Sequence, residues 1–255
     1  SAVGMGAVEA GQGFLSLGTS GVLFVVTPDY QPNAASATHA FCHAVPGRWH
    51  QMSVMLSAAS ALQWVSDLLG AANAGEVATR AAALSPQDRA ASPLFLPYLS
   101  GERTPHNNAA ATGVFMGLRA EHEATDLAYA VMEGVGFGLL DGLNAMRAAG
   151  AGQGGAATRD DAALALVGGG ARSNTWAQLL ASALGTPLQR PQGAHAAAAL
   201  GAARLAAMAC GGDEAHWCQS LPADATFVPQ PAQQALLAER YARFVALYPA
   251  LQSQF

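Results

Sequence analysis

Two glycine turns that carry polar residues are the features of this sequence best suited to chemistry. The first, Gly18-Thr19-Ser20-Gly21, follows a short apolar run, and the second, Gly168-Gly169-Gly170-Ala171-Arg172-Ser173-Asn174, follows the run 164–167. Because glycine has no side chain, such turns let backbone N–H groups approach an anionic ligand closely. Taken alone, the first is better explained as a tight hairpin turn and the second as a sharp bend. Two such turns in one domain suggest a nucleotide held between them.

The sequence contains no lysine, because all twelve of its basic residues are arginine. A Walker A loop, a lysine Schiff base and pyridoxal phosphate chemistry are therefore excluded for these residues. A bound phosphate must meet backbone amides, hydroxyls, arginine or a metal ion. The net charge of −5 and the absence of a basic run argue against nucleic acid or an anionic membrane as the main partner.

The cysteines and histidines favour neither disulfides nor a metal site. Three cysteines (Cys42, Cys210 and Cys218) are too few for a disulfide framework and indicate a reducing cytoplasm. Two candidate zinc groups lack the paired spacing of a structural site, so ordinary packing is expected for them. These groups are His39 with Cys42 and His43, and His216 with Cys218.

No signal peptide is apparent, and the longest apolar stretch is too short to cross a bilayer.

The elements that must position the two turns alternate between strand and helix. Apolar spacing predicts a hairpin of 14–17 and 22–26, and a helix over 51–69 that Gly70 ends. Gln63 lies on that helix and is expected to be a surface residue. A loop-rich segment follows at 91–112, in which Glu102 and Arg103 are expected to form an exposed ion pair. The further predicted elements are a long helix at 126–146, a flexible loop at 148–157, strands at 164–167 and 188–190, and helices at 174–184, 196–208 and 232–251.

This alternation predicts an α/β domain. The glycines Gly134, Gly136 and Gly138 would weaken the long helix, so they indicate close packing against a neighbouring element. Ser173 or Asn174 would cap the helix that follows the second turn, and that helix end favours negative charge.

A more specific pattern lies between the two turns. Gly113-Val114-Phe115-Met116-Gly117-Leu118, followed after seven residues by Asp126-Leu127-Ala128-Tyr129-Ala130-Val131-Met132-Glu133, resembles the second signature of the FGGY carbohydrate kinases at every constrained position. Three further stretches, 52–59, 96–108 and 200–205, are similar more narrowly to the xylulokinases of that family. The resemblance covers essentially the whole chain, as a C-terminal domain.

The resemblance implies an actin-like ATPase fold with ribonuclease H-like topology, in which ATP and Mg²⁺ bind in a cleft between two domains. Gly18 and Thr19 would then approach the phosphates, and Gln63 would contact the nucleotide. Gly170 and Asn174 would contact the adenosine. The full predicted ATP-binding set is Gly18, Thr19, Ser20, Gln63, Gly169, Gly170, Ala171 and Asn174. No residue is predicted to ligate a metal.

The resemblance also implies that part of the enzyme lies outside this chain. The family's general base, an aspartate in a Gly-Asp-Asn motif, and the N-terminal sugar-binding domain are expected upstream of residue 1. Residues 1–255 are therefore expected to be the C-terminal domain, with no catalytic residue and no activity of their own. His195 stands where relatives commonly have an acidic residue, and packing is expected for it.

The implied activity is cytoplasmic, ATP-dependent phosphorylation of D-xylulose to xylulose 5-phosphate. Two alternatives stay open at this point. The first is another FGGY kinase, acting on glycerol, gluconate or a different pentose. The second is a non-catalytic actin-like module that binds nucleotide. A homodimer is also left open.

Overall fold

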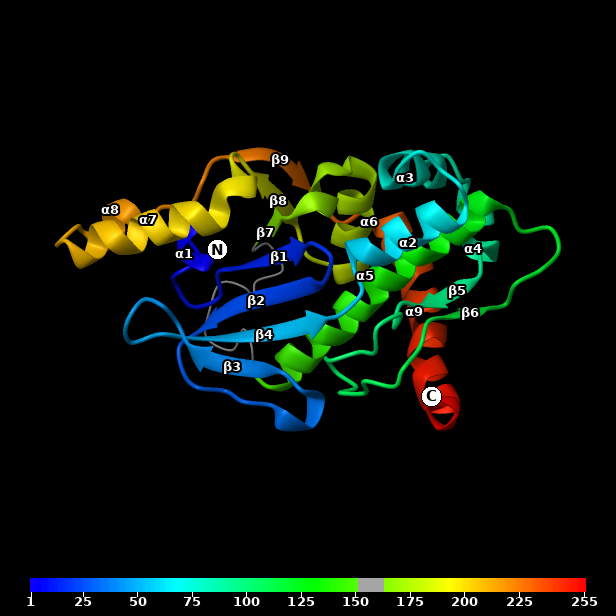
Figure 1. The fold of residues 1–255 in the computed structure, drawn as a ribbon, viewed down its shortest axis with the longest axis horizontal. Coiled ribbons are helices and arrows are strands. Elements are labelled where there is room, and N and C mark those ends of the chain that lie inside the picture. Colours follow the sequence, from blue (N-terminus) through cyan, green and yellow to red (C-terminus); the bar gives the residue numbers. More distant parts are fainter. Residues whose placement is uncertain (151–162) are drawn as a thin grey trace.

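A mixed sheet organises the fold (Figure 1). A computed structural model describes residues 1–150 and 163–255. In this part of the chain the strand order is β3-β4-β2-β1-β7-β8-β9. The strands are β1 Gly13–Leu17, β2 Gly21–Thr27, β3 His39–Cys42, β4 Trp49–Met55, β7 Leu164–Val167, β8 Leu188–Pro191 and β9 Ala223–Phe227. A separate pair consists of β5 Leu94–Leu96 and β6 Val114–Met116.

The pairing confirms the ribonuclease H-like topology. Strands β4, β2 and β1 are antiparallel neighbours, and β7 and β8 continue the sheet parallel to β1. Strands β3 and β9 extend the two edges in antiparallel pairing. The predicted α/β class is therefore correct.

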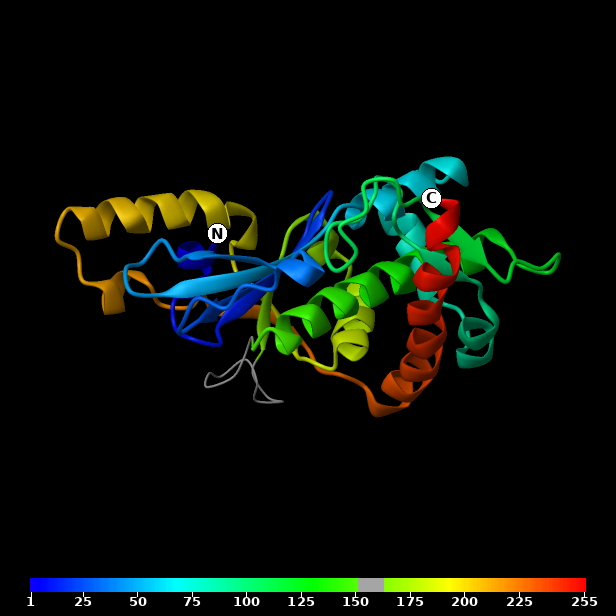
Figure 2. The same cartoon turned by 90° about the horizontal axis from the view of Figure 1, so that it is seen from below.

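Helices cover both faces of the sheet, as Figure 2 shows. On one face, Leu15 and Leu23 pack into the large core beneath α5 and α6. On the other, Phe14 and Phe24 pack against Met5 of α1 and the start of α7. The helices are α1 Ala2–Met5, α2 Ala59–Leu68, α3 Ala74–Ala82, α4 Pro86–Ala91, α5 Ala124–Ala148, α6 Asn174–Leu184, α7 Ala197–Ala209, α8 Glu214–Trp217 and α9 Pro231–Leu251.

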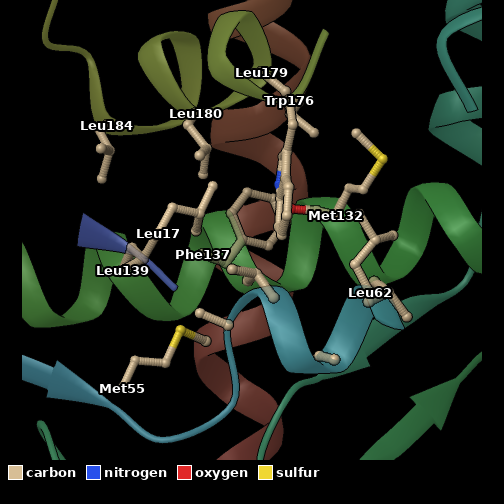
Figure 3. Packing of buried hydrophobic residues seen from close by; sticks show 14 of the residues in the cluster. Leu17, Met55, Leu62, Met132, Phe137, Leu139, Trp176, Leu179, Leu180 and Leu184 are labelled. Atoms are coloured by element: carbon tan, nitrogen blue, oxygen red, sulfur yellow. The ribbon is translucent and has the colours of Figure 1, made fainter. Parts of the chain in front are cut away.

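The end of β1 is anchored in the large core (Figure 3). Leu17, the last residue of β1, is fully buried together with Phe137 of α5 and Leu180 of α6. The indole Nε1 of Trp176 donates a hydrogen bond of 3.1 Å to the carbonyl of Met132, which ties α6 to α5. The turn that follows β1 therefore starts from a rigid, close-packed position.

Most predicted elements are confirmed, including the hairpin, the strands at 164–167 and 188–190, and the helices after residue 120. The close packing predicted for the glycines of α5 is also present. A Cβ added at Gly134 would collide with the carbonyl oxygen of Phe95, and one at Gly138 would lie 2.7 Å from Cε of Met55. Gly136 has only ordinary contacts with α6.

The helix predicted over 51–69 is wrong at its N-terminal end. Trp49–Met55 is β4, which pairs with β2 and β3, and α2 begins only at Ala59. The buried side of β4 carries Gln51 and Ser53 as well as Met55, so polar residues conceal the two-residue period of the strand. The apolar residues of β4 and α2 also happen to fit one helical spacing. Gly70 follows α2 in the left-handed region, at φ +65°.

Two predicted loops also differ from the structure. The loop-rich segment 91–112 contains β5. A flexible loop was expected at 148–157. Its first residue, Ala148, is instead the last residue of α5, and residues 151–157 lie outside the described ranges. Among the described helices, none combines the length and the apolar character that spanning a membrane requires.

Candidate functional site

The two glycine turns lie side by side at one end of the sheet. Strands β1 and β7 are parallel, with Ser16 opposite Val167, so both turns leave the sheet in the same direction. Gly168 has φ +96°, and a Cβ added there would lie 2.6 Å from the carbonyl oxygen of Leu17. A Cβ at Gly170 would lie 2.6 Å from the Leu17 side chain, whereas one at Gly169 would meet nothing within 4 Å. Contact between the turns therefore requires Gly168 and Gly170, and Gly169 borders open space.

The tip of the β1–β2 hairpin caps the N-terminus of α2. The N–H of Ala59 donates to the carbonyl of Gly18 at 2.8 Å, and the Ser60 hydroxyl donates to that of Thr19 at 2.7 Å. The first N–H groups of a helix have no partner within it, so these contacts satisfy α2 and fix the tip. The N–H of Gly18 donates to the Ser20 carbonyl at 3.1 Å. Within the described ranges, the N–H groups of Thr19 and Ser20 donate to no protein acceptor and are free for an anion.

A cavity of about 900 Å³ lies between the two turns, α2, α3 and the start of α6. Its volume is within the range of small-molecule and cofactor sites. Six of the eight predicted residues line it: Gly18, Thr19, Gln63, Gly169, Gly170 and Asn174. The other two, Ser20 and Ala171, do not line it. Asn73, the N-cap of α3, and Thr79 of α3 also line the cavity, and sequence reasoning missed them because this helix carries no chemical motif.

The start of α6 presents polar groups to this cavity. Ser173 is the N-cap, because its hydroxyl oxygen accepts a hydrogen bond of 3.2 Å from the N–H of Trp176. Asn174 is the first helical residue, and its Oδ1 accepts 2.9 Å from Nη1 of Arg190. The positive end of the helix dipole favours a negatively charged ligand here. On α2, Gln63 is exposed, and its amide donates to Asp67 at 2.7 Å.

A second cavity, of about 560 Å³, shares Gly169 and Arg172 with the first. Arg190, Asp224 and His195 also line it. The packing expected for His195 is wrong, because the residue is exposed in a short 3₁₀ turn before α7. The open face of Gly169 thus borders both cavities.

Glu102 differs from its prediction as an exposed partner of Arg103. It is 3% exposed, and its Oε1 accepts from the N–H groups of Leu56 at 3.2 Å and Arg103 at 2.6 Å. The guanidinium of Arg103 instead donates to Asn107. Leu56 lies just before the start of α2, so Glu102 supports the segment that holds the hairpin tip. Sequence reasoning missed this role because a buried carboxyl group in a loop leaves no periodic signal.

Glu102 should make the stability of the protein pH-dependent. Burial raises the pKa of Glu102 to about 8 from 4.5, so between these values the folded state holds a proton that the unfolded state releases. The free energy of unfolding should then fall as pH rises through this window, by at most about 1.4 kcal/mol per pH unit. Urea denaturation of the wild type and of Glu102→Gln, measured from pH 5 to 8, compares the slopes. Glu102→Gln keeps an acceptor oxygen and should flatten the dependence. Identical slopes would contradict the assignment.

Metal-binding side chains do not cluster in the described ranges. No group of three or more His, Cys, Asp and Glu residues in 1–150 and 163–255 could hold a metal ion. Of the zinc candidates, Cys42 is exposed, whereas Cys218 is buried with its Sγ 3.7 Å from Sδ of Met208. His43 is also buried, and this burial lowers its pKa. Cys218 and His43 therefore take part in packing.

The sequence matches the model of the FGGY family of carbohydrate kinases, C-terminal domain, over residues 13–210. The chain belongs to this family. It is 45% identical over 253 residues to the xylulose kinase of Escherichia coli K12, covering 98% of this chain and 50% of that protein. It is 50% identical over 209 residues to the xylulose kinase of Klebsiella pneumoniae, covering 82% of this chain and 41% of that protein.

Solved structures of FGGY proteins share the fold. The crystal structure of a protein described as a xyloylose kinase, from Brucella ovis, matches with a TM-score of 0.90 and 44% identity, covering 100% of this chain and 51% of that one. The xylulose kinase of Rhodospirillum rubrum matches with a TM-score of 0.82 and 27% identity, covering 99% of this chain and 49% of that one. The chain thus spans about half the length of the relatives it matches.

The FGGY signature of this chain serves the fold. None of its residues (113–118 and 126–133) is among the described residues that line the 900 Å³ cavity. Its last residue, Glu133, is 1% exposed and forms a two-pronged ion pair with Arg240 of α9, at 2.6 and 2.7 Å. Arg240 also donates to the carbonyls of Ala90, Ser92 and Pro93. The signature helix α5 is thereby fastened to α9 and to the end of α4 with the segment that joins it to β5.

Proposed function

We propose that residues 1–255 form the C-terminal, nucleotide-binding domain of an ATP-dependent sugar kinase that phosphorylates xylulose. The observation that carries the proposal is the 900 Å³ cavity, onto which both glycine turns open together with Gln63 and Asn174. Identity of 45–50% to xylulose kinases of two enterobacteria supports xylulose as the sugar. The proposed compartment is the cytoplasm, consistent with three free cysteines.

ATP would lie along this cavity with its phosphates at the hairpin tip. The N–H group of Thr19, which lines the cavity, would donate to a phosphate oxygen, as main-chain amides commonly do at anion sites. Gln63 and Asn174 would contact the nucleoside, between α2 and the start of α6. The Thr19 hydroxyl, at the exposed tip, is a further donor. Mg²⁺ would bind phosphate oxygens of ATP and water, since no carboxylate is among the described residues that line the cavity, and it would neutralise charge during transfer.

The transfer step breaks the bond between Pγ and the β,γ-bridging oxygen and forms a bond between Pγ and a sugar hydroxyl oxygen. The hydroxyl proton must pass to a general base. No Asp, Glu or His is among the described residues that line the cavity, so its chemistry is that of binding and orientation. We propose that the base and most sugar contacts belong to the other half of the enzyme, since the chain spans about half the length of the relatives it matches.

This chain should bind ATP without transferring phosphate. We expect a dissociation constant on the order of 1 mM, about 4 kcal/mol of binding free energy, because only one wall of the cleft is supplied. Isothermal calorimetry with ATP, ADP and AMP measures the affinity, and loss of affinity from ATP to AMP would locate the phosphates on the protein. A coupled assay with xylulose and Mg²⁺ should detect no turnover. No heat at millimolar ATP, or measurable transfer, would contradict the proposal.

A further inference from the structure

The guanidinium of Arg190, at the end of β8, makes contacts on three sides. Its Nη1 donates to the carbonyl of Ala171 at 3.0 Å and to Oδ1 of Asn174 at 2.9 Å. Its Nε donates to Asp224 of β9 at 3.0 Å, and its Cζ lies 5.8 Å from the ring centroid of Phe227. The Arg190 side chain is 21% exposed. These contacts hold the guanidinium in one orientation against the glycine turn.

The hydrogen bond from Arg190 fixes the orientation of the Asn174 side-chain amide. A guanidinium carries only hydrogen-bond donors, so the atom of Asn174 that faces Arg190 must be the oxygen. The NH₂ group must then be the end of the amide that Arg190 does not hold. Asn174 lines the 900 Å³ cavity, and its NH₂ group donates to no residue in the described ranges. A ligand in the cavity would therefore meet Asn174 as a donor.

We propose that Arg190 is a positioning residue, which fixes the Asn174 amide so that it donates to an acceptor atom of the bound nucleotide, a ring nitrogen of the base or an oxygen of the ribose. The proposal deepens the nucleotide-binding function proposed above and rests on it. The same nitrogen also donates to the carbonyl of Ala171, which does not line the cavity. Asp224, in turn, holds the other side of the guanidinium.

A double-mutant cycle separates this role from direct contact with the ligand. Arg190→Met and Asn174→Ala should each raise the dissociation constant for ATP up to about tenfold, the effect of one lost hydrogen bond between the Asn174 amide and the nucleotide. If Arg190 acts through Asn174, the double variant should bind no more weakly than Asn174→Ala. Multiplicative losses would overturn the proposal. Arg119→Met removes an exposed arginine whose pairing distance to Glu121 is 3.6 Å, and it should leave the affinity unchanged.

The side-chain amide of Asn174 supplies a readout that needs no ligand. In ¹⁵N-labelled free protein, its NH₂ resonances, assigned by their absence in Asn174→Asp, should be well separated and should move toward unstructured values in Arg190→Met. Unchanged resonances would overturn the positioning role. If the wild type fails to bind ATP while these resonances move, the nucleotide function fails and the positioning contact stands. Should Arg190→Met not fold, Arg190→Leu, which likewise removes every donor at this position, gives the same comparison.

Discussion

Gly169→Val should remove most nucleotide binding while leaving the melting temperature of the chain unchanged. A Cβ added at Gly169 would meet no protein atom within 4 Å, and its backbone is outside the left-handed region, so the fold accepts a side chain there. The isopropyl group would instead occupy space in the cavity where the ligand must approach the turn. We expect the dissociation constant for ATP to rise at least tenfold, or about 1.4 kcal/mol. Calorimetry and thermal unfolding measure the two effects.

Gly170→Val is the matched control, one residue further along the turn. Its Cβ would lie 2.6 Å from Cδ2 and Cγ of Leu17, which is fully buried in the core. This variant should lose stability as well as affinity, since the clash would displace β1. If Gly169→Val binds ATP as tightly as the wild type, the glycine turn is only a bend, and the nucleotide site lies elsewhere.

Glu133→Ala should lower the free energy of unfolding by about 3–5 kcal/mol, because it leaves the charge of Arg240 buried without its counter-ion. Arg240 is 2% exposed, and three main-chain carbonyls are its only other acceptors among the described residues. Urea denaturation, analysed at constant m-value, measures the loss. Glu133→Ala should lower stability more than it weakens ATP binding, since neither Glu133 nor Arg240 lines the cavity.

Two variants test this explanation. Glu133→Gln keeps the shape and one acceptor oxygen, so it should cost less than Glu133→Ala. Glu121→Ala removes an exposed partner of Arg119 and should change stability by less than about 0.5 kcal/mol. Equal losses for Glu133→Ala and Glu121→Ala would show that the buried pair adds nothing beyond surface charge.

The elements near the site were largely predictable because local signals and tertiary structure agree there. The hairpin around Thr19 and the turn after β7 are strand–glycine patterns that need no knowledge of distant residues. β4 was missed because its buried face carries Gln51 and Ser53, which only the packed structure explains. Here tertiary packing overrides the sequence pattern.

Side chains that act through other residues were the least predictable part of the site. Arg190 lies on a short strand, and its contact with Asn174 joins residues sixteen positions apart in sequence. Glu102 supports Leu56 across forty-six positions. Such contacts follow from how the strands and loops come together, and residue type or spacing does not indicate them. Two residues predicted to bind ATP as parts of the glycine turns, Ser20 and Ala171, do not line the cavity.

The capping of α2 by the hairpin tip has a mechanical consequence. Gln63 lies one helical turn beyond Ala59, whose N–H is held by the Gly18 carbonyl. Any movement of the tip must therefore carry Gln63 with it. The hairpin tip and α2 would therefore contact the two ends of a ligand as one rigid unit. The turn after β7 would face that unit from the other side of the cavity.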